Sequence, residues 1–149
     1  MELLKENNID GFLFSTDKHK LDLKYVHDFI STKSYWAKGI PREVVERSIT
    51  NSLSFGIYHH HNQVGFARIV TDYATFGYLA DVFVDEAYRR KGLSKKLMEF
   101  IFTLDELSNL RRIMLGTRDA HNLYKKYGFK QLASPDRFME LHRPDIYNG

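Results

Sequence analysis

The sequence predicts a single domain of the α+β or mixed α/β class, with seven strands and four helices in the order β-α-α-β-β-β-α-β-α-β-β. Two observations support this prediction. The chain has 149 residues, of which 43% are hydrophobic and only three are Pro and nine Gly, and this is typical of one globular unit. Short apolar runs bounded by turn residues alternate with stretches of helical periodicity, and no internal repeat or linker divides residues 1–149.

The first third of the chain is predicted to contain one strand and two helices. Phe12-Leu13-Phe14 is a short apolar run of the kind found in buried strands. Apolar side chains then recur at helical spacing between Asp17 and Ile30, and Pro41 suits the first position of a second helix. The predicted elements are a strand at 12–14, helices at 17–30 and 42–51, and a polar loop at 31–40.

The remaining elements alternate strands with helices. Three strand-like segments joined by short turns predict an antiparallel meander, and an amphipathic stretch after them predicts a helix. Gly128 is the kind of residue that ends a helix. The predicted elements are strands at 53–59, 64–72 and 76–84, a helix at 92–104, a strand at 113–115, a helix at 119–127, and strands at 129–133 and 138–141.

Composition excludes several classes of protein. The chain has no cysteine, which excludes disulfides, Cys-ligated zinc or iron–sulfur sites and a Cys nucleophile, and it fits a reducing compartment. No apolar stretch could span a bilayer, and the acidic first turn is unlike a signal peptide, so we expect a cytoplasmic protein that does not act at a membrane. The net charge is only +3, and proteins that bind nucleic acid usually concentrate more positive charge than this on one face, so nucleic acid is not favoured as a partner. His59, His60 and His61 alternate faces at a hairpin, so no metal site is expected.

The segment 78–104 is the most informative part of the chain. A strand runs into the basic turn Arg89-Arg90-Lys91-Gly92, which opens a helix. The first turn of a helix has unpaired backbone N–H groups and a positive dipole end, so a phosphate can dock there, and Gly92 leaves room for it. From this pattern alone, a solvated basic loop before an ordinary helix is an equal alternative.

Two motifs resemble those of the GCN5-related N-acetyltransferases, the GNAT superfamily. Motif A of that family, a strand followed by Gln/Arg-x-x-Gly-x-Gly/Ala and a helix, corresponds to Arg89-Arg90-Lys91-Gly92-Leu93-Ser94, with Ser94 in the last small position. Motif B corresponds to Ala120–Phe129, with its L-Y-x-x-x-G-F core intact, while Thr117 replaces the usual Asn. The order and separation of the motifs and the order of the elements extend the resemblance over nearly the whole chain.

The resemblance implies a GNAT-like α/β fold with a central, mixed and mostly antiparallel seven-stranded sheet. It also implies that acetyl coenzyme A, used without a metal, lies between two splayed strands at 78–84 and 113–115. Strand backbone groups would pair with the pantetheine arm, and the amides that open the next helix would hold the diphosphate. The residues implied to bind the coenzyme are Val82, Phe83, Val84, Arg89, Arg90, Lys91, Gly92, Leu93, Ser94, Lys95 and Thr117.

For catalysis, the resemblance assigns Tyr124 the position of the general acid that protonates the departing thiolate. Asp81 is the candidate base, because on a regular strand it lies opposite Val82, on one face with Leu79 and Phe83, and can face a polar cleft. A structural Asp bonded to neighbouring amides is an equal alternative, and some family members use only water chains. Ala80, where many members have an acid, weakens a polyamine acceptor.

The acceptor is expected to contact the loop between the first two helices, at Tyr35 and Trp36. Asp72, Arg118 and His121 could also reach the cleft; Asp72 would suit an amine and Arg118 a carboxylate. We therefore predict direct acetyl transfer to a primary amine of a small molecule. The alternatives are a protein or peptide acceptor, a non-catalytic CoA-binding or regulatory module and, less favoured, a nucleic-acid-binding domain. The resemblance also allows a homodimer.

Overall fold

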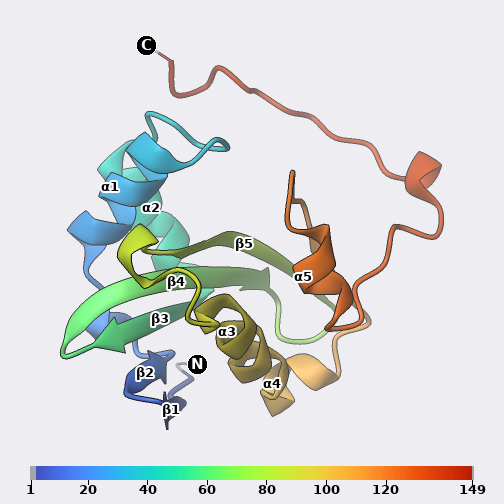
Figure 1. The fold of residues 1–149 in the computed structure, drawn as a ribbon. Helices are drawn as coiled ribbons and strands as arrows, with labels where there is room; N and C mark the ends of the chain where they lie inside the picture. The colour runs from blue at the N-terminus through green and yellow to red at the C-terminus, as the bar shows by residue number, and fades with distance from the viewer. Residues whose placement is uncertain (1–2, 149) are drawn as a thin grey trace.

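The computed structural model describes residues 3–148, and its centre is one mixed sheet of six strands in chain order (Figure 1). Strands β1 to β5 pair antiparallel, and β6 pairs parallel to β5. The predicted mixed and mostly antiparallel sheet is therefore confirmed, with six strands in place of seven. The strands are β1 (Glu6–Ile9), β2 (Phe12–Ser15), β3 (Leu53–His59), β4 (Asn62–Thr71), β5 (Phe76–Val84) and β6 (Arg112–Leu115).

Five α-helices and three short 3-10 turns complete the described part of the chain. The first α-helix begins later than predicted, because the Asp22 carboxylate accepts a hydrogen bond of 3.0 Å from the Tyr25 N–H and caps it there. No helix within residues 3–148 is long and apolar enough to cross a bilayer. The helices are α1 (Leu23–Lys33), α2 (Arg42–Thr50), α3 (Leu93–Phe102), α4 (Asp105–Ser108) and α5 (His121–Lys125), and the turns are η1 (Lys18–Lys20), η2 (Glu86–Tyr88) and η3 (Pro135–Arg137).

The sheet separates two hydrophobic cores. On one face, α1 and α2 pack against Phe66 and Phe83, and the Phe83 ring stacks on that of Phe29 with 3.8 Å between centroids. On the other face, α3 and the Tyr124 ring pack against alternate residues of β3, β4 and β5. Helices therefore cover both faces, as Figure 1 shows, and the central strand β3 and most of β4 are buried on both sides.

A β-bulge interrupts the regular alternation of β5. Between the pairs Arg68↔Ala80 and Phe66↔Phe83, β5 has one residue more than β4, and Asp81 takes a left-handed backbone with φ of 54°. The extra residue places Leu79 and Val82 against the same core, while Phe83 faces α1 and α2. The expectation that Asp81 shares a face with both Leu79 and Phe83 is therefore wrong, because it assumed an uninterrupted period of two.

Both strands predicted after Gly128, at 129–133 and 138–141, are absent from the structure. The chain turns at η3, where Pro135 fixes the backbone, and then runs past α5 toward the loop between α1 and α2 (Figure 1). Among residues 3–148, no backbone hydrogen bond joins segment 130–148 to the sheet, and Met139 is 98% exposed. A strand-like sequence does not form a strand without a partner, and here no neighbour pairs with it.

A hairpin that the sequence analysis missed occupies the other end of the sheet. β1 is too polar to resemble a buried strand, and it pairs with β2 across the turn Asp10-Gly11. Both turn residues have positive φ, 53° and 85°, as a two-residue hairpin of this kind requires. The Asp-Gly dipeptide was the available signal for this turn.

The end of α5 shows why motif B has its spacing. Gly128 has φ of 91°, and this left-handed turn lets the Phe129 N–H bond the Tyr124 carbonyl at 3.3 Å. The Phe129 ring then packs edge-on to the Tyr124 ring at 6.0 Å and to the Phe102 ring at 5.5 Å. The Gly-Phe pair therefore fixes the orientation of the Tyr124 side chain.

Replacing Gly128 with Ala should destabilise the fold by about 1 kcal/mol, because only the left-handed backbone resists the change. A Cβ at this position would meet no atom within 4 Å. The expected fall in Tm is about 3 °C by differential scanning calorimetry. Gly128→Asn is the control, since Asn tolerates this conformation and should lose less. Equal stability of Gly128→Ala and the parent chain would contradict this account.

Candidate active site

A cavity of about 850 Å³ opens where β5 and β6 diverge. The two strands pair from Phe76↔Arg112 to Leu79↔Leu115, and β5 then continues over Ala80–Val84 without β6 beside it. The cavity is bounded by these strands, the start of α5, the loop between α1 and α2, and the C-terminal segment 142–148. Its lining residues are Tyr35, Trp36, Ala37, Lys38, Ile40, Val44, Ser48, Arg68, Tyr78, Leu79, Ala80, Asp81, Val82, Leu115, Gly116, Thr117, Arg118, Asp119, Ala120, Tyr124, His142, Arg143, Pro144, Ile146, Tyr147 and Asn148.

Asp81 lies in this cavity with both carboxylate oxygens engaged. Oδ2 accepts a hydrogen bond from Arg68 Nε at 2.7 Å, and Oδ1 accepts one from Trp36 Nε1 at 2.7 Å. The Arg68 side chain is 18% exposed and that of Asp81 10%, so the ion pair is mostly removed from water. Arg68 also donates from Nη1 to the Ser52 hydroxyl at 3.1 Å. Asp81 thus joins the bulge in β5 to β4 and to the loop between α1 and α2.

Asp81 and Trp36 were predicted as site residues from the sequence, and Arg68 was not. A signal was present, because Arg68 is a cation in the middle of an otherwise apolar strand segment, Phe66–Val70. Such a charge needs a partner when the strand is buried. Asp81 is the acidic residue of the next strand in the meander, so the pair could have been anticipated.

Tyr124 also lines the cavity, and its side chain is almost fully buried. Its hydroxyl has no hydrogen-bond partner among residues 3–148. Burial raises the pKa of Tyr124 to about 12, with smaller contributions from Tyr35 and Asp119. The phenol is therefore protonated at neutral pH and available to donate to a group in the cavity.

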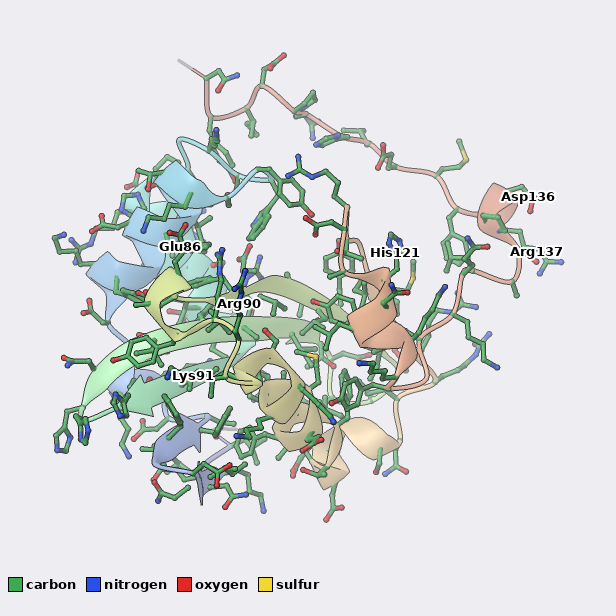
Figure 2. All side chains as sticks on the ribbon, viewed as in Figure 1. Glu86, Arg90, Lys91, His121, Asp136 and Arg137 are labelled. Atoms are coloured by element: carbon green, nitrogen blue, oxygen red, sulfur yellow. The ribbon has the colours of Figure 1, made fainter. Side chains whose placement is uncertain are left out.

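The turn between η2 and α3 leaves a row of amides unpaired. Gly92 caps α3 with φ of 73°, and a Cβ there would meet nothing within 4 Å. The first backbone hydrogen bond of the helix is from the Lys96 N–H to the Gly92 carbonyl at 3.0 Å. The N–H groups of 90–95 have no partner within the described chain. Figure 2 shows Arg90 and Lys91 on this exposed turn. The arrangement suits an anion bound by backbone amides and basic side chains.

The other expected coenzyme contacts are partly engaged within the chain. The Arg89 guanidinium donates from Nε to the Val84 carbonyl at 3.2 Å, so this side chain braces the end of β5. The Thr117 hydroxyl accepts a hydrogen bond of 3.1 Å from the Ala120 N–H before α5. The Phe83 ring is directed into the core beside Phe29, which leaves its backbone as the group able to bind a ligand.

The expected acceptor residues divide into two groups. Tyr35 and Trp36 line the cavity with perpendicular rings 5.0 Å apart. Asp72 does not line it, because its carboxylate caps the turn between β4 and β5 and accepts hydrogen bonds from the Ala74, Thr75 and Phe76 amides. The three amides and the Thr75 hydroxyl lower the pKa of Asp72, which is a consequence of the turn. His121 lies at the start of α5 (Figure 2) and is not among the lining residues.

Comparison with known proteins agrees with the fold and these motifs. Residues 50–131 match the model of the acetyltransferase (GNAT) domain. A crystal structure of a GNAT-family protein from Xanthomonas campestris pv. campestris is 42% identical, covers 95% of this chain and all of its own, and superposes with a TM-score of 0.92. The chain belongs to the GNAT acetyltransferase family.

More distant relatives extend the comparison. A Gibberella zeae protein named "Putative acetyltransferase FG08082" is 27% identical over 84% of this chain and 82% of its own length. A Clostridium acetobutylicum acetyltransferase structure with acetyl-CoA shares the fold, with a TM-score of 0.59 at 19% identity over 82% of this chain and 92% of its own. These matches support the fold and the family assignment.

The Arg68–Asp81 pair should be strongly coupled in stability. Arg68→Met should lower the free energy of unfolding by roughly 3 kcal/mol, because it leaves a partly buried carboxylate unpaired. Asp81→Asn should destabilise through the same loss, although Asn tolerates the left-handed backbone. Urea unfolding of both single variants and the double variant should give a coupling energy of about 1–3 kcal/mol. Additive effects would show that the ion pair does not hold the bulge.

Proposed function

We propose that the chain transfers the acetyl group of acetyl-CoA directly to a primary amine of a small molecule. The observation that supports this most is the protonated hydroxyl of Tyr124, which has no hydrogen-bond partner within residues 3–148 and lies in a cavity between splayed strands. Tyr124 also has the motif position of the general acid in the family to which the chain belongs. A non-catalytic CoA-binding module needs no such group, and the tests below separate the two functions.

The coenzyme would be held by groups that the fold leaves unpaired. The amides of 90–95 suit the diphosphate, and Arg90 and Lys91 add positive charge beside them. The free edge of β5 over Ala80–Val84 offers backbone groups to an extended amide-containing arm. A donor on this edge near Val82 would also stabilise charge that develops on the thioester oxygen.

Proton transfer has two requirements, and we assign them to different groups. The acceptor must lose a proton, since an alkylammonium has a pKa of about 10.4. The leaving thiolate must gain one, and Tyr124 can supply it because its phenol stays protonated until the pH approaches its pKa of about 12. A Tyr in this state cannot serve as the base.

We propose that water, and not Asp81, carries the proton away from the acceptor. Both carboxylate oxygens of Asp81 already accept hydrogen bonds of 2.7 Å, from Arg68 and from Trp36, and these contacts hold the carboxylate against the cavity wall. In this arrangement Asp81 is a positioning residue that holds the Trp36 indole in the cavity wall. The geometry therefore favours this positioning role for Asp81 over its predicted role as a base.

Gly92→Glu should abolish acetyl-CoA binding, because it adds bulk and negative charge where the amides would hold the diphosphate. Isothermal titration calorimetry with CoA measures the effect directly. Gly11→Glu is a matched control, since Gly11 is also left-handed and open but lies in the β1–β2 turn. Unchanged affinity in Gly92→Glu would mean that the coenzyme binds elsewhere.

Tyr124→Phe should lower kcat roughly 100-fold with an unchanged Kd for acetyl-CoA, because it removes the proton donor and keeps the ring. Release of CoA thiol with an amine panel provides the rate.

In the parent chain, kcat should rise with pH as the acceptor deprotonates, and it should not fall again below about pH 10, because the high pKa keeps Tyr124 protonated. Asp81→Asn should keep the rising limb and most of kcat, and a fall in kcat of about 100-fold or more with an unchanged Kd for acetyl-CoA would restore Asp81 as the base. An unchanged rate in Tyr124→Phe would remove Tyr124 from the mechanism.

A further inference from the structure

We propose that the acceptor amine also carries a carboxylate, and that Arg118 binds this carboxylate. The inference rests on the proposed function, and it adds the chemical class of the acceptor and the residue that selects it. Three observations carry it: the way Arg118 is held, the charge of the cavity, and the place of Arg118 in the chain.

Arg118 is held by Tyr35, which together with Trp36 forms an aromatic wall of the cavity. Its guanidinium carbon lies 3.9 Å from the centre of the Tyr35 ring, and its backbone N–H donates to the Tyr35 hydroxyl at 3.0 Å. The ring covers one face of the guanidinium, so the N–H groups at its edge remain available in the plane. Among residues 3–148, Arg118 has no ion-pair partner. This geometry suits a bidentate contact with a carboxylate.

The described residues that line the cavity carry an excess of positive charge. Among them, Arg68 and Asp81 neutralise each other, and Lys38, Arg118 and Arg143 remain with one carboxylate, that of Asp119. A simple alkylammonium would enter a site of its own sign, which is unfavourable. An acceptor with a carboxylate brings the missing negative charge with it.

Arg118 is also placed where it can orient the acceptor for reaction. It lies three residues before the start of α5, the short helix that carries Tyr124, and both side chains line the cavity. Tyr35, on which Arg118 stacks, belongs to the same aromatic wall as Trp36. A carboxylate held here ties one end of the acceptor to the wall, and the amine is left free to approach the thioester.

The test compares acceptors that differ only in the carboxylate, such as phenylalanine against phenethylamine and lysine against cadaverine. Rates are expressed per concentration of unprotonated amine, because a carboxylate lowers the pKa of its neighbour. We expect kcat/KM to be at least about 10-fold higher for the acids, the size of a charge-assisted hydrogen bond. Equal values for both classes would overturn the inference and leave the proposed function intact.

Arg118→Gln should then lower kcat/KM for the acids roughly 10- to 100-fold, mainly through KM, and leave the amines unchanged. Arg118→Lys should restore part of the loss. Arg47→Gln, which removes an exposed cation of α2 outside the cavity, is the control and should have no effect.

CoA affinity, measured by calorimetry, separates the remaining outcomes. An unchanged Kd in Arg118→Gln supports an acceptor site. A weaker Kd would assign Arg118 to the coenzyme phosphates and overturn the inference. Absence of transfer to every amine, with CoA still bound, would overturn the proposed function and with it this inference.

Discussion

The ion pair between Arg68 and Asp81 is the interaction on which the rest of the site depends. It sits at the bulge where β5 gains one residue over β4, and the left-handed Asp81 is held there by Arg68. Its second oxygen fixes the Trp36 indole, and so one ion pair connects the sheet to the loop between α1 and α2. Beyond this point β5 runs on without β6, and the cavity opens there.

The family motifs have local physical explanations in this chain. Gly92 allows the left-handed cap that exposes the amides of α3, and its lack of a side chain keeps the space in front of them open. Gly128 allows the turn that returns Phe129 to the Tyr124 ring. In both motifs, a glycine with positive φ turns the chain and so sets the position of a neighbouring group: the amides of α3 in one, and the Phe129 ring against Tyr124 in the other. The side chains around each glycine then add charge or packing.

The electrostatics of the cavity divide its charged residues by role. Asp81 is paired with Arg68, while Tyr124 stays neutral because burial raises its pKa to about 12. Arg118 has no ion-pair partner within the described residues and stacks on Tyr35 at the acceptor wall. Asp81, the expected base, is therefore engaged within the fold. Arg118 is the charged residue that we propose to contact the acceptor.

Local sequence determined the elements whose signals are local. Helix periodicity, the glycine turns and the meander of β3 to β5 all depend on neighbours in the chain; these elements occur in the predicted order, although α1 begins later than predicted. Asp10-Gly11 was also a local signal, for the turn between β1 and β2. The hairpin was not predicted because β1 is polar and does not resemble a buried strand. The prediction that the turn before α3 binds the coenzyme and that Tyr124 is the general acid rests on motifs of the same local kind.

Tertiary structure alone decided what depends on a distant partner. Segment 138–141 was predicted to be a strand, yet it forms none, because no edge of the described sheet pairs with it. The bulge at Asp81 changed which residues share a face, since register is set by the neighbouring strand and not by the sequence of β5. The hydrogen bonds that Asp81 accepts come from Arg68 and Trp36, 13 and 45 residues away, which only folding brings within hydrogen-bond distance.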